Sequence, residues 1–514
     1  MYKRFLLALL AALSLTVAAG RPALAADAVG TISGHITTSR GDPAASAHVV
    51  LFHPSGIASF EKLAQRDGTF QFDNVGAGDY KLSVEYDGVH QFAHRKLTFA
   101  EGDTFTVQAG TNTVIDEQMF APGAIEVKVV DAGDGNPVES ACVTLLNGLE
   151  NCSPQDGVFR FEGLGQRPDY VISARAADGL HMPREIRDVA VELGKTTEIT
   201  IALDPAAVIT TRVLDRASGA PVPFICVAAL SKYFGATQDG FCPEITKDPA
   251  GESAEDGTVR IGEIPVGRRR LFVVPQDGVH GIQWLGKDGG TGSQYRALNI
   301  KVIPGHVSTV GPILLDPPGS LSGTFVDATG GPLETNFVCA TAMPVDLGIP
   351  VGANCNVTGG SFVIPGLGPY RWPVGFFSDG STYGTQWPGS AKLDRRSAPT
   401  FKVEAGTTTD VGTLKLQKGR RVFGDVLGAD GHSWPGTVSV TIVNARTGDV
   451  LGSSCCNSSY LISPVTEQNI KIRVFAENHG TFWVKNGATI EDGDTIHISS
   501  DEDTDLDIVV PADQ

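Results

Sequence analysis

The segment Asp67-Gly-Thr-Phe-Gln-Phe72, followed by Val75-Gly-Ala-Gly-Asp-Tyr-Lys-Leu-Ser-Val84, decides the fold. Apolar and polar residues alternate in both halves, which is the pattern of β-strands that bury one face. The Asp-Gly pair favours a tight turn with positive φ at the glycine, and the second Gly-rich turn returns the chain as the next strand. The segment therefore predicts an antiparallel pair of strands whose alternating aromatic side chains fill a core.

Variants of this segment recur four more times along the 514 residues. The spacing is roughly a hundred residues, which is too long for the unit of about 20 to 50 residues that builds a solenoid. An alternating strand precedes each copy, at 30–36, 124–130, 208–214, 320–326 and 421–427. Several short strands per copy, bounded by Gly, Pro and Asp, predict a two-layer β-sandwich. We expect separate beads, each with its own core.

Composition agrees with strands and excludes some functions. The chain has 61 Gly and 30 Pro, and only 19% of its residues are charged, which favours turns and strands over helices. The net charge of −18 argues against nucleic acid as a partner, because a phosphate-binding surface has to be basic. The sequence contains no His-Glu-x-x-His and no phosphate-binding loop, so it predicts no catalytic residue, no metal and no cofactor.

The order of these motifs resembles a known family. A Gly turn, Pro-x-x-x-Ala/Cys-x-Val, Asp-Gly-x-Phe-x-Phe and Gly-x-Tyr-x-Leu-x-Val together resemble the carboxypeptidase regulatory-like (transthyretin-like) domain. The resemblance implies Greek-key, prealbumin-like sandwiches in tandem in an exported bacterial protein, without catalytic residues of their own. The fifth copy departs from the pattern, since Ser458-Ser459 replaces Asp-Gly. The expected fold is all-β, with sandwiches at 27–120, 121–204, 205–317, 318–417 and 418–514.

The N-terminus predicts export. Lys3-Arg4 precedes the apolar run Phe5 to Ala19, and Ala23-Leu-Ala25 is typical of a cleavage site, so residues 1–25 are expected to be a signal peptide. Gly20, Arg21 and Pro22 interrupt the apolar run before it could cross a bilayer. We expect a secreted or periplasmic protein that is not inserted in the membrane after cleavage.

Six of the eight cysteines fall as one pair in each of the second, third and fourth copies. In each pair the first Cys lies in the second strand and the other lies before the Asp-Gly or Gly-Gly turn. An exported chain permits oxidation. The expected disulfides join Cys142 with Cys152, Cys226 with Cys242, and Cys339 with Cys355. For Cys455 and Cys456 a bond between neighbours, two free thiols and an intermolecular bridge all remain open.

Two polar motifs recur after the core strands. Asp-Gly-x-His occurs at 87–90, 178–181 and 277–280. Two ligands per copy cannot close a metal site, so we interpret the motif as a turn followed by a strand residue. Gln-Trp occurs at 283–284 and 386–387, where Trp284 and Trp387 are either exposed rings that stack on a sugar or rings packed over the sandwich end, and packing is favoured.

Three functional hypotheses follow. The favoured one is a non-enzymatic array of modules with a structural, adhesive or partner-binding role, whose partner is a protein or polysaccharide at the cell exterior. The alternative is a carbohydrate-binding protein that uses Trp284 and Trp387. The third is an enzyme with an unrecognised site, which would show convergent carboxylates or paired histidines in a deep pocket.

Overall fold

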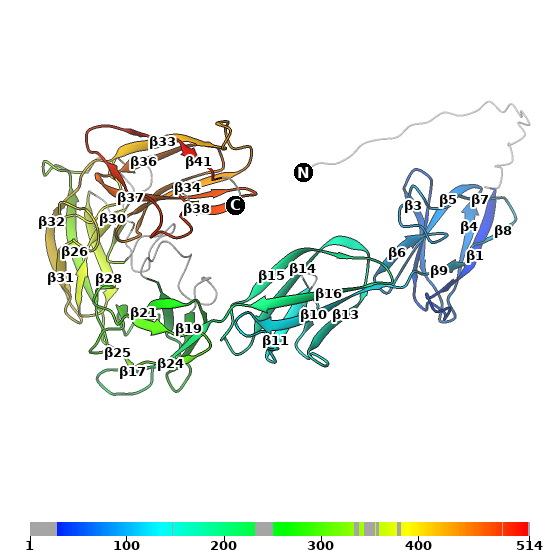
Figure 1. Ribbon diagram of the computed structural model, residues 1–514, viewed down its shortest axis with the longest axis horizontal. Helices are drawn as coiled ribbons and strands as arrows, with labels where there is room; N and C mark the ends of the chain where they lie inside the picture. The colour runs from blue at the N-terminus through cyan, green and yellow to red at the C-terminus, as the bar shows by residue number, and fades with distance from the viewer. Residues whose placement is uncertain are drawn as a thin grey trace, which may run out of the picture. The chain divides into compact units, whose positions relative to one another are not determined.

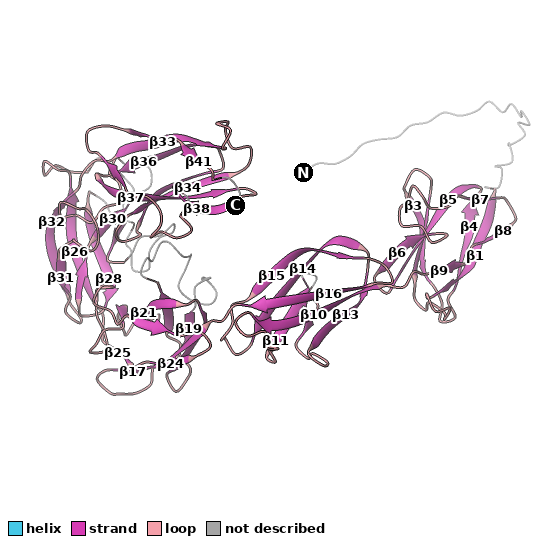
Figure 2. Cartoon of the chain, in the orientation of Figure 1, coloured by secondary structure: helices cyan, strands magenta, loops and turns pink. Residues whose placement is uncertain are grey.

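The structure is a computed structural model of the whole chain. It describes residues 28–145, 148–231, 250–333, 339–343, 355, 359–377, 382–485 and 487–511. The expected signal peptide lies outside these residues. Figure 2 shows strands and loops, and the described residues contain no helix, so none of them forms a helical membrane span. The predicted all-β fold, with tandem sandwiches, is confirmed.

Five sandwiches follow one another along the chain, and many of their strands are labelled in Figure 1. The first contains β1 (Val29–Thr37), β2 (His48–Phe52), β3 (Ala58–Leu63), β4 (Thr69–Gly76), β5 (Gly78–Tyr86), β6 (Val89–Phe92), β7 (Phe105–Val107), β8 (Asn112–Val114) and β9 (Glu117–Gln118). The second contains β10 (Gly123–Asp131), β11 (Ala141–Leu145), β12 (Glu150–Asn151), β13 (Val158–Leu164), β14 (Arg167–Ala176), β15 (Arg184–Val191) and β16 (Thr196–Leu203).

The third contains β17 (Ala207–Asp215), β18 (Cys226–Leu230), β19 (Ala250–Glu252), β20 (Thr258–Ile264), β21 (Gly267–Val274), β22 (Gln283–Trp284), β23 (Ile300–Val302), β24 (Val307–Thr309) and β25 (Ile313–Leu315). The fourth contains β26 (Gly319–Val326), β27 (Cys339–Thr341), β28 (Ser361–Leu367), β29 (Arg371–Pro373), β30 (Gly375–Phe377), β31 (Thr400–Lys402) and β32 (Thr408–Lys415). The fifth contains β33 (Arg420–Leu427), β34 (Val438–Asn444), β35 (Val450–Cys455), β36 (Ser459–Val465), β37 (Gln468–Ala476), β38 (Gly480–Trp483), β39 (Ile496–Ile498), β40 (Thr504–Asp505) and β41 (Ile508–Val509).

The opening strand of each sandwich is the centre of one sheet. In the first sandwich the sheet order is β4-β1-β8, with β1 antiparallel to β4 and parallel to β8. The other layer has the order β3-β2-β5-β6. Every opening strand carries a bulge where it meets its antiparallel neighbour, starting after Gly30, Gly123, Ala207, Gly319 and Arg420. A shared bulge at one register position shows that the five units are built to one plan.

The Asp-Gly turn forms as predicted. Gly68, between β3 and β4, has a φ of 80°, which is a left-handed conformation that glycine adopts at low cost. The Asp67 carboxylate accepts hydrogen bonds from the backbone N–H of Thr69 (3.1 Å) and from its hydroxyl (2.7 Å). Phe70 and Phe72 then point into the core and are 2% and 5% exposed.

The cores are not all separate. The first sandwich has its own core, whose buried members include Ile32, Leu51 and Val84. The third sandwich also has an inner core, but the opposite face of its β18 and β21 joins the core of the fourth sandwich in one cluster. The prediction of separate beads is therefore wrong for these two sandwiches. A strand whose two faces are both covered can belong to two cores at once.

Of the described residues, those of 28–128, 145, 148–172 and 186–200 belong to one compact unit, and the rest belong to a second. The division passes through the second sandwich. Each contact discussed below lies within one unit.

Candidate functional site

Two of the Asp-Gly-x-His turns, at Gly88 and Gly179, contact the next sandwich. Gly88, in the turn between β5 and β6, lies against the carbonyl oxygen of Gly163 near the end of β13, and a Cβ at Gly88 would collide with that oxygen. A Cβ at Gly165 would in turn lie 2.5 Å from the carbonyl oxygen of Gly88. Because the two backbones approach this closely, glycine is needed on both sides of the contact. The two Gly-rich turns thus act as a pair that joins successive sandwiches, a role the sequence analysis did not assign to them.

The same docking recurs further along the chain. Glu263 donates its backbone N–H to the carbonyl oxygen of Gly179 (2.7 Å). Ile282 donates to the carbonyl oxygen of Gly366 (2.9 Å), and Gly368 donates back to the carbonyl oxygen of Ile282 (3.0 Å). These bonds pair the backbone of one sandwich with the turn of the next, so each junction satisfies polar groups that would otherwise face solvent.

A buried glutamine holds the connecting segment at three of the junctions. Gln91, Gln283 and Gln386 are each 0% exposed. The Gln386 side chain donates to the carbonyl oxygen of Gln417 (2.9 Å) and accepts from its N–H (2.9 Å). Gln91 donates to the carbonyl oxygen of Gln118 (3.0 Å) and accepts from the N–H of Phe120 (2.7 Å). We call these three side chains the linker glutamines.

The third linker glutamine makes the equivalent bond on the donor side. Gln283 donates to the carbonyl oxygens of Leu314 and Gly289, both at 3.0 Å. The second sandwich uses its backbone instead, since Ala206 donates to the carbonyl oxygen of Leu180 (2.6 Å) and Met182 to that of Asp204 (2.8 Å). A buried amide that loses such partners costs about 1–3 kcal/mol, so each linker is held in place by the penalty for releasing it.

Two of the three Asp-Gly-x-His motifs form carboxylate–imidazole–carboxylate bridges. His280 lies between Asp277 (Nδ1 to Oδ2, 2.5 Å) and Asp215 (Nε2 to Oδ2, 3.2 Å), and its side chain is 8% exposed. Burial lowers the pKa of His280, but the bonds to the two carboxylates outweigh burial and raise that pKa above its ordinary value. The bonds to Ser218 and His280 lower the pKa of Asp215 to about 2.

His181 repeats the bridge, with Asp131 at 3.0 Å and Asp178 at 3.3 Å. Both ring nitrogens of each histidine are thus occupied by carboxylates that fix the turn to the end of the opening strand, β10 or β17. An imidazole paired on both sides offers no lone pair for a metal. The geometry agrees with the interpretation of the motif as a turn.

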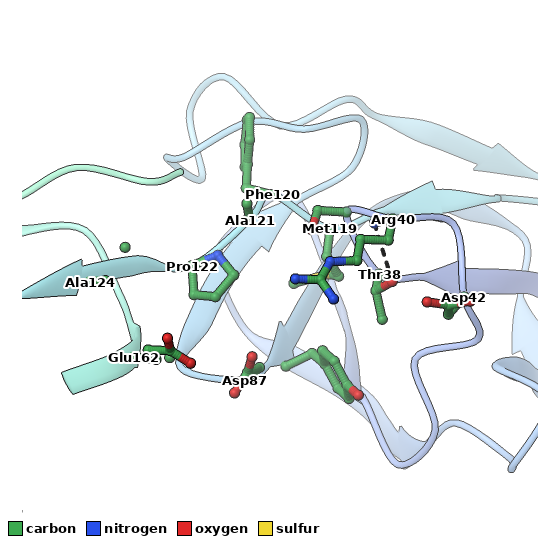
Figure 3. Close-up of a pocket in the computed structure, with 14 residues that line it drawn as sticks. Thr38, Arg40, Asp42, Asp87, Met119, Phe120, Ala121, Pro122, Ala124 and Glu162 are labelled. Carbon is green, nitrogen blue, oxygen red and sulfur yellow. Dashed lines mark hydrogen bonds between the residues drawn. The ribbon is translucent and has the colours of Figure 1, made fainter. Parts of the chain in front are cut away.

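A cavity of about 460 Å³ lies where the first sandwich meets the second. Figure 3 shows the Arg40 guanidinium, the Asp87 and Glu162 carboxylates and Pro122 of the linker around this cavity. The residues that line it include hydroxyl groups but no histidine. The lining therefore offers one guanidinium, that of Arg40, and three carboxylates, those of Asp42, Asp87 and Glu162.

Comparison with known proteins assigns the first sandwich to a family. Residues 31–112 match the model of the family described as "Carboxypeptidase regulatory-like domain". The first sandwich is a carboxypeptidase regulatory-like domain. The four later sandwiches repeat its central opening strand and its bulge.

One curated relative and two solved structures complete the comparison. A 194-residue stretch, 37% of this chain, is 27% identical to Halomucin of Haloquadratum walsbyi and spans 2% of that protein. The Bacillus anthracis TIE protein aligns at 12% identity over 72% of this chain and 66% of its own, with a TM-score of 0.17. BcpA, the major pilin subunit of Bacillus cereus, aligns at 12% identity over 56% of this chain and 99% of its own, also at 0.17. These TM-scores carry no argument about function.

The tryptophans proposed to stack on sugars are buried in the repeats that follow the regulatory-like domain. Trp284 and Trp387 are 1% and 2% exposed, which confirms the favoured interpretation of packed rings and contradicts the alternative of exposed rings. Trp284 packs on Phe272, with ring centroids 4.6 Å apart. Neighbouring residues of an extended segment point to opposite sides, and the glutamine before each Trp binds the linker, so the ring turns into the core. In the Gln-Trp motif the glutamine therefore binds the linker, and the tryptophan packs into the core. The regulatory-like domain has Gln91-Phe92 in the same place.

The described cysteines of the repeats after the regulatory-like domain are oxidised. Cys339 and Cys355 are joined by a disulfide, and so are the neighbours Cys455 and Cys456. Cys142, Cys152 and Cys226 are also disulfide-bonded. Cys242 lies outside the described residues, and the pairings of Cys142 with Cys152 and of Cys226 with Cys242 stay predictions.

Proposed function

We propose that this chain is an exported, non-enzymatic array of β-sandwiches that has a structural, adhesive or partner-binding role outside the cytoplasm. The observation that carries the proposal is the set of linker glutamines. The polar side chains that recur along the chain bind the connecting segments and turns, and are not gathered around a shared reaction centre.

Two physical points support this role. The linker glutamines are fully buried and bonded to backbone in or just after the last strand of their own sandwich, so displacing the segment that leaves the sandwich would strand a buried amide without partners. The shared core of the third and fourth sandwiches adds apolar area that separation would expose. An array built in this way keeps the spacing of its units, which is what a structural or adhesive protein needs.

Export is supported by the N-terminal pattern and by the disulfide between Cys339 and Cys355, since disulfides persist in oxidising compartments. We expect the mature protein to begin at Ala26. N-terminal sequencing of protein recovered from the periplasm or medium tests this. Recovery of the uncleaved chain in the cytoplasm would contradict it.

The experiment for the array uses the full chain with Gln283→Leu and Gln386→Leu combined. Leucine keeps the volume but cannot bind the linker, so we expect faster protease cleavage near 314–318 and 417–419 and a broader distribution of distances in small-angle scattering. Gln71→Leu is the control, because Gln71 is exposed on β4. Unchanged scattering and cleavage in the double variant, with circular dichroism showing a folded chain, would contradict the role of the glutamines.

A further inference from the structure

A cluster of buried hydrogen-bond donors lies where the third, fourth and fifth sandwiches meet. Arg395, in the segment between β30 and β31, is 5% exposed. Its Nε faces the Asp449 carboxylate (3.1 Å to Oδ2), and its Nη1 donates to the Gln294 side chain (2.7 Å). Its Nη2 is buried and has no partner among the described residues.

Other buried donors around Arg395 also lack a hydrogen-bond partner. Six buried side-chain polar atoms of the described residues lack a hydrogen-bond partner, and five of them belong to this region. The five atoms are listed as Arg270 Nε, Tyr295 Oη, Trp387 Nε1, Ser390 Oγ and Arg395 Nη2. All five can donate a hydrogen bond, and the three nitrogens can only donate.

The distances tie these groups together. The Arg395 guanidinium carbon lies 5.4 Å from the centre of the Tyr295 ring and 5.7 Å from that of Trp387. The guanidinium carbon of Arg396 also lies near this ring, 5.6 Å from its centre. Arg270, on β21, is close enough to Arg395 that, after burial, their mutual repulsion helps to lower the pKa of Arg270. Burial raises the pKa of Tyr295, so its hydroxyl keeps its proton and remains a donor.

The charges of the cluster do not balance. The guanidinium groups of Arg270, Arg395, Arg396 and Arg446 meet the two carboxylates of Asp394 and Asp449. Arg395 pairs with Asp449 at 3.1 Å and Arg446 pairs with Asp394 at 3.0 Å, whereas Arg396 is exposed to solvent. These pairs leave the positive charge of the half-buried Arg270 uncompensated, beside the partnerless Nη2 of Arg395. A charge withdrawn from water without a partner is costly, so the arrangement favours an anion.

We propose that this cluster binds a small oxyanion, with the chemistry of a phosphate, sulfate or carboxylate group, through Arg270, Tyr295 and Arg395. An oxyanion supplies several acceptor atoms and negative charge together, and it accepts charge-assisted bonds from guanidinium groups. A water molecule would accept at most two of these bonds and would need acceptors for its own hydrogens. The site is separate from the linker glutamines, so its failure would leave the array proposal intact.

The test is isothermal titration of the full chain with sodium phosphate, sodium sulfate and sodium acetate, in chloride buffer of constant ionic strength. We expect saturable binding of at least one anion, and a loss of about tenfold or more in affinity for Arg270→Gln, since one charge-assisted bond is worth about 1.5–3 kcal/mol. Comparing the three arms separates the tetrahedral anions from a carboxylate.

A second variant keeps the proposal testable if Arg270→Gln fails to fold. Tyr295→Phe removes a buried hydroxyl that lacks a partner, so we expect it to raise the melting temperature without anion while it weakens anion binding. Arg421→Gln is the matched control, because it removes the same charge from a surface pair with Asp503, where the Arg421 side chain is 59% exposed. The proposal would be overturned if none of the three anions binds saturably, or if the affinity is unchanged in Arg270→Gln and Tyr295→Phe. Either result would mean that the cluster holds an adventitious ion only.

Discussion

The first and third sandwiches use the same strand plan to build different cores. In the first, β2 has alternating burial, with Val49 and Leu51 at 0% exposure between less buried neighbours. In the third, every residue of the equivalent β18 is buried, because one face packs inside its own sandwich and the other joins the fourth. The number of covered faces, and not the topology, therefore determines whether neighbouring sandwiches should unfold separately or together.

The largest effect is expected from removing an aromatic ring in each core. Phe272→Ala and Phe70→Ala remove side chains that are 0% and 2% exposed, and each should cost about 3–5 kcal/mol. Scanning calorimetry of the full chain should show that Phe272→Ala lowers the transitions of the third and fourth sandwiches together, whereas Phe70→Ala lowers only that of the first. A fourth sandwich that melts unchanged in Phe272→Ala would refute the shared core.

A smaller effect is expected from spoiling one docking contact. A Cβ at Gly281 would lie 2.5 Å from the backbone nitrogen of Gly368, so Gly281→Ala forces the two sandwiches apart and should cost about 1–3 kcal/mol. Gly311→Ala is the control in the same sandwich, because nothing lies within 4 Å of its Cβ position. Chemical denaturation would measure both. Equal stabilities for the two variants would show that the contact does not form in solution.

The smallest effect concerns the histidine bridge of the third sandwich. The raised pKa of His280 means that its protonated form stabilises the fold. This stabilisation is complete below the unfolded pKa of about 6.5 and is lost as the pH rises through the higher folded value. We expect the stability advantage of the native chain over His280→Gln to shrink as the pH rises from about 6.5 through the raised pKa of the folded state.

Unfolding at a series of pH values measures this change. His432→Gln serves as the control, since the His432 side chain is 85% exposed. A difference between the native chain and His280→Gln that does not depend on pH would mean that the bridge holds a neutral imidazole.

Some of these features could be predicted from particular residues. Asp67-Gly68 requires a turn and Phe70 and Phe72 alternate, so the strand pair was predictable from local chemistry. The continuous apolar run Ile225-Cys-Val-Ala-Ala-Leu230 differs from the alternating His48–Phe52 and, in retrospect, signals a strand covered on both faces. Gln91 carried no signal of its own, because its role depends on backbone atoms of residues 118 and 120.

The amino-acid sequence by itself determined the strands, their turns and the repetition of one sandwich, because alternation and Asp-Gly chemistry act between residues that are close in the chain. Tertiary structure alone decided that Gln283 holds a linker, that Trp284 is buried and that Arg395 meets Asp449 of another sandwich. Those outcomes depend on which surfaces are brought together and deprived of water, and that pairing joins residues far apart in sequence.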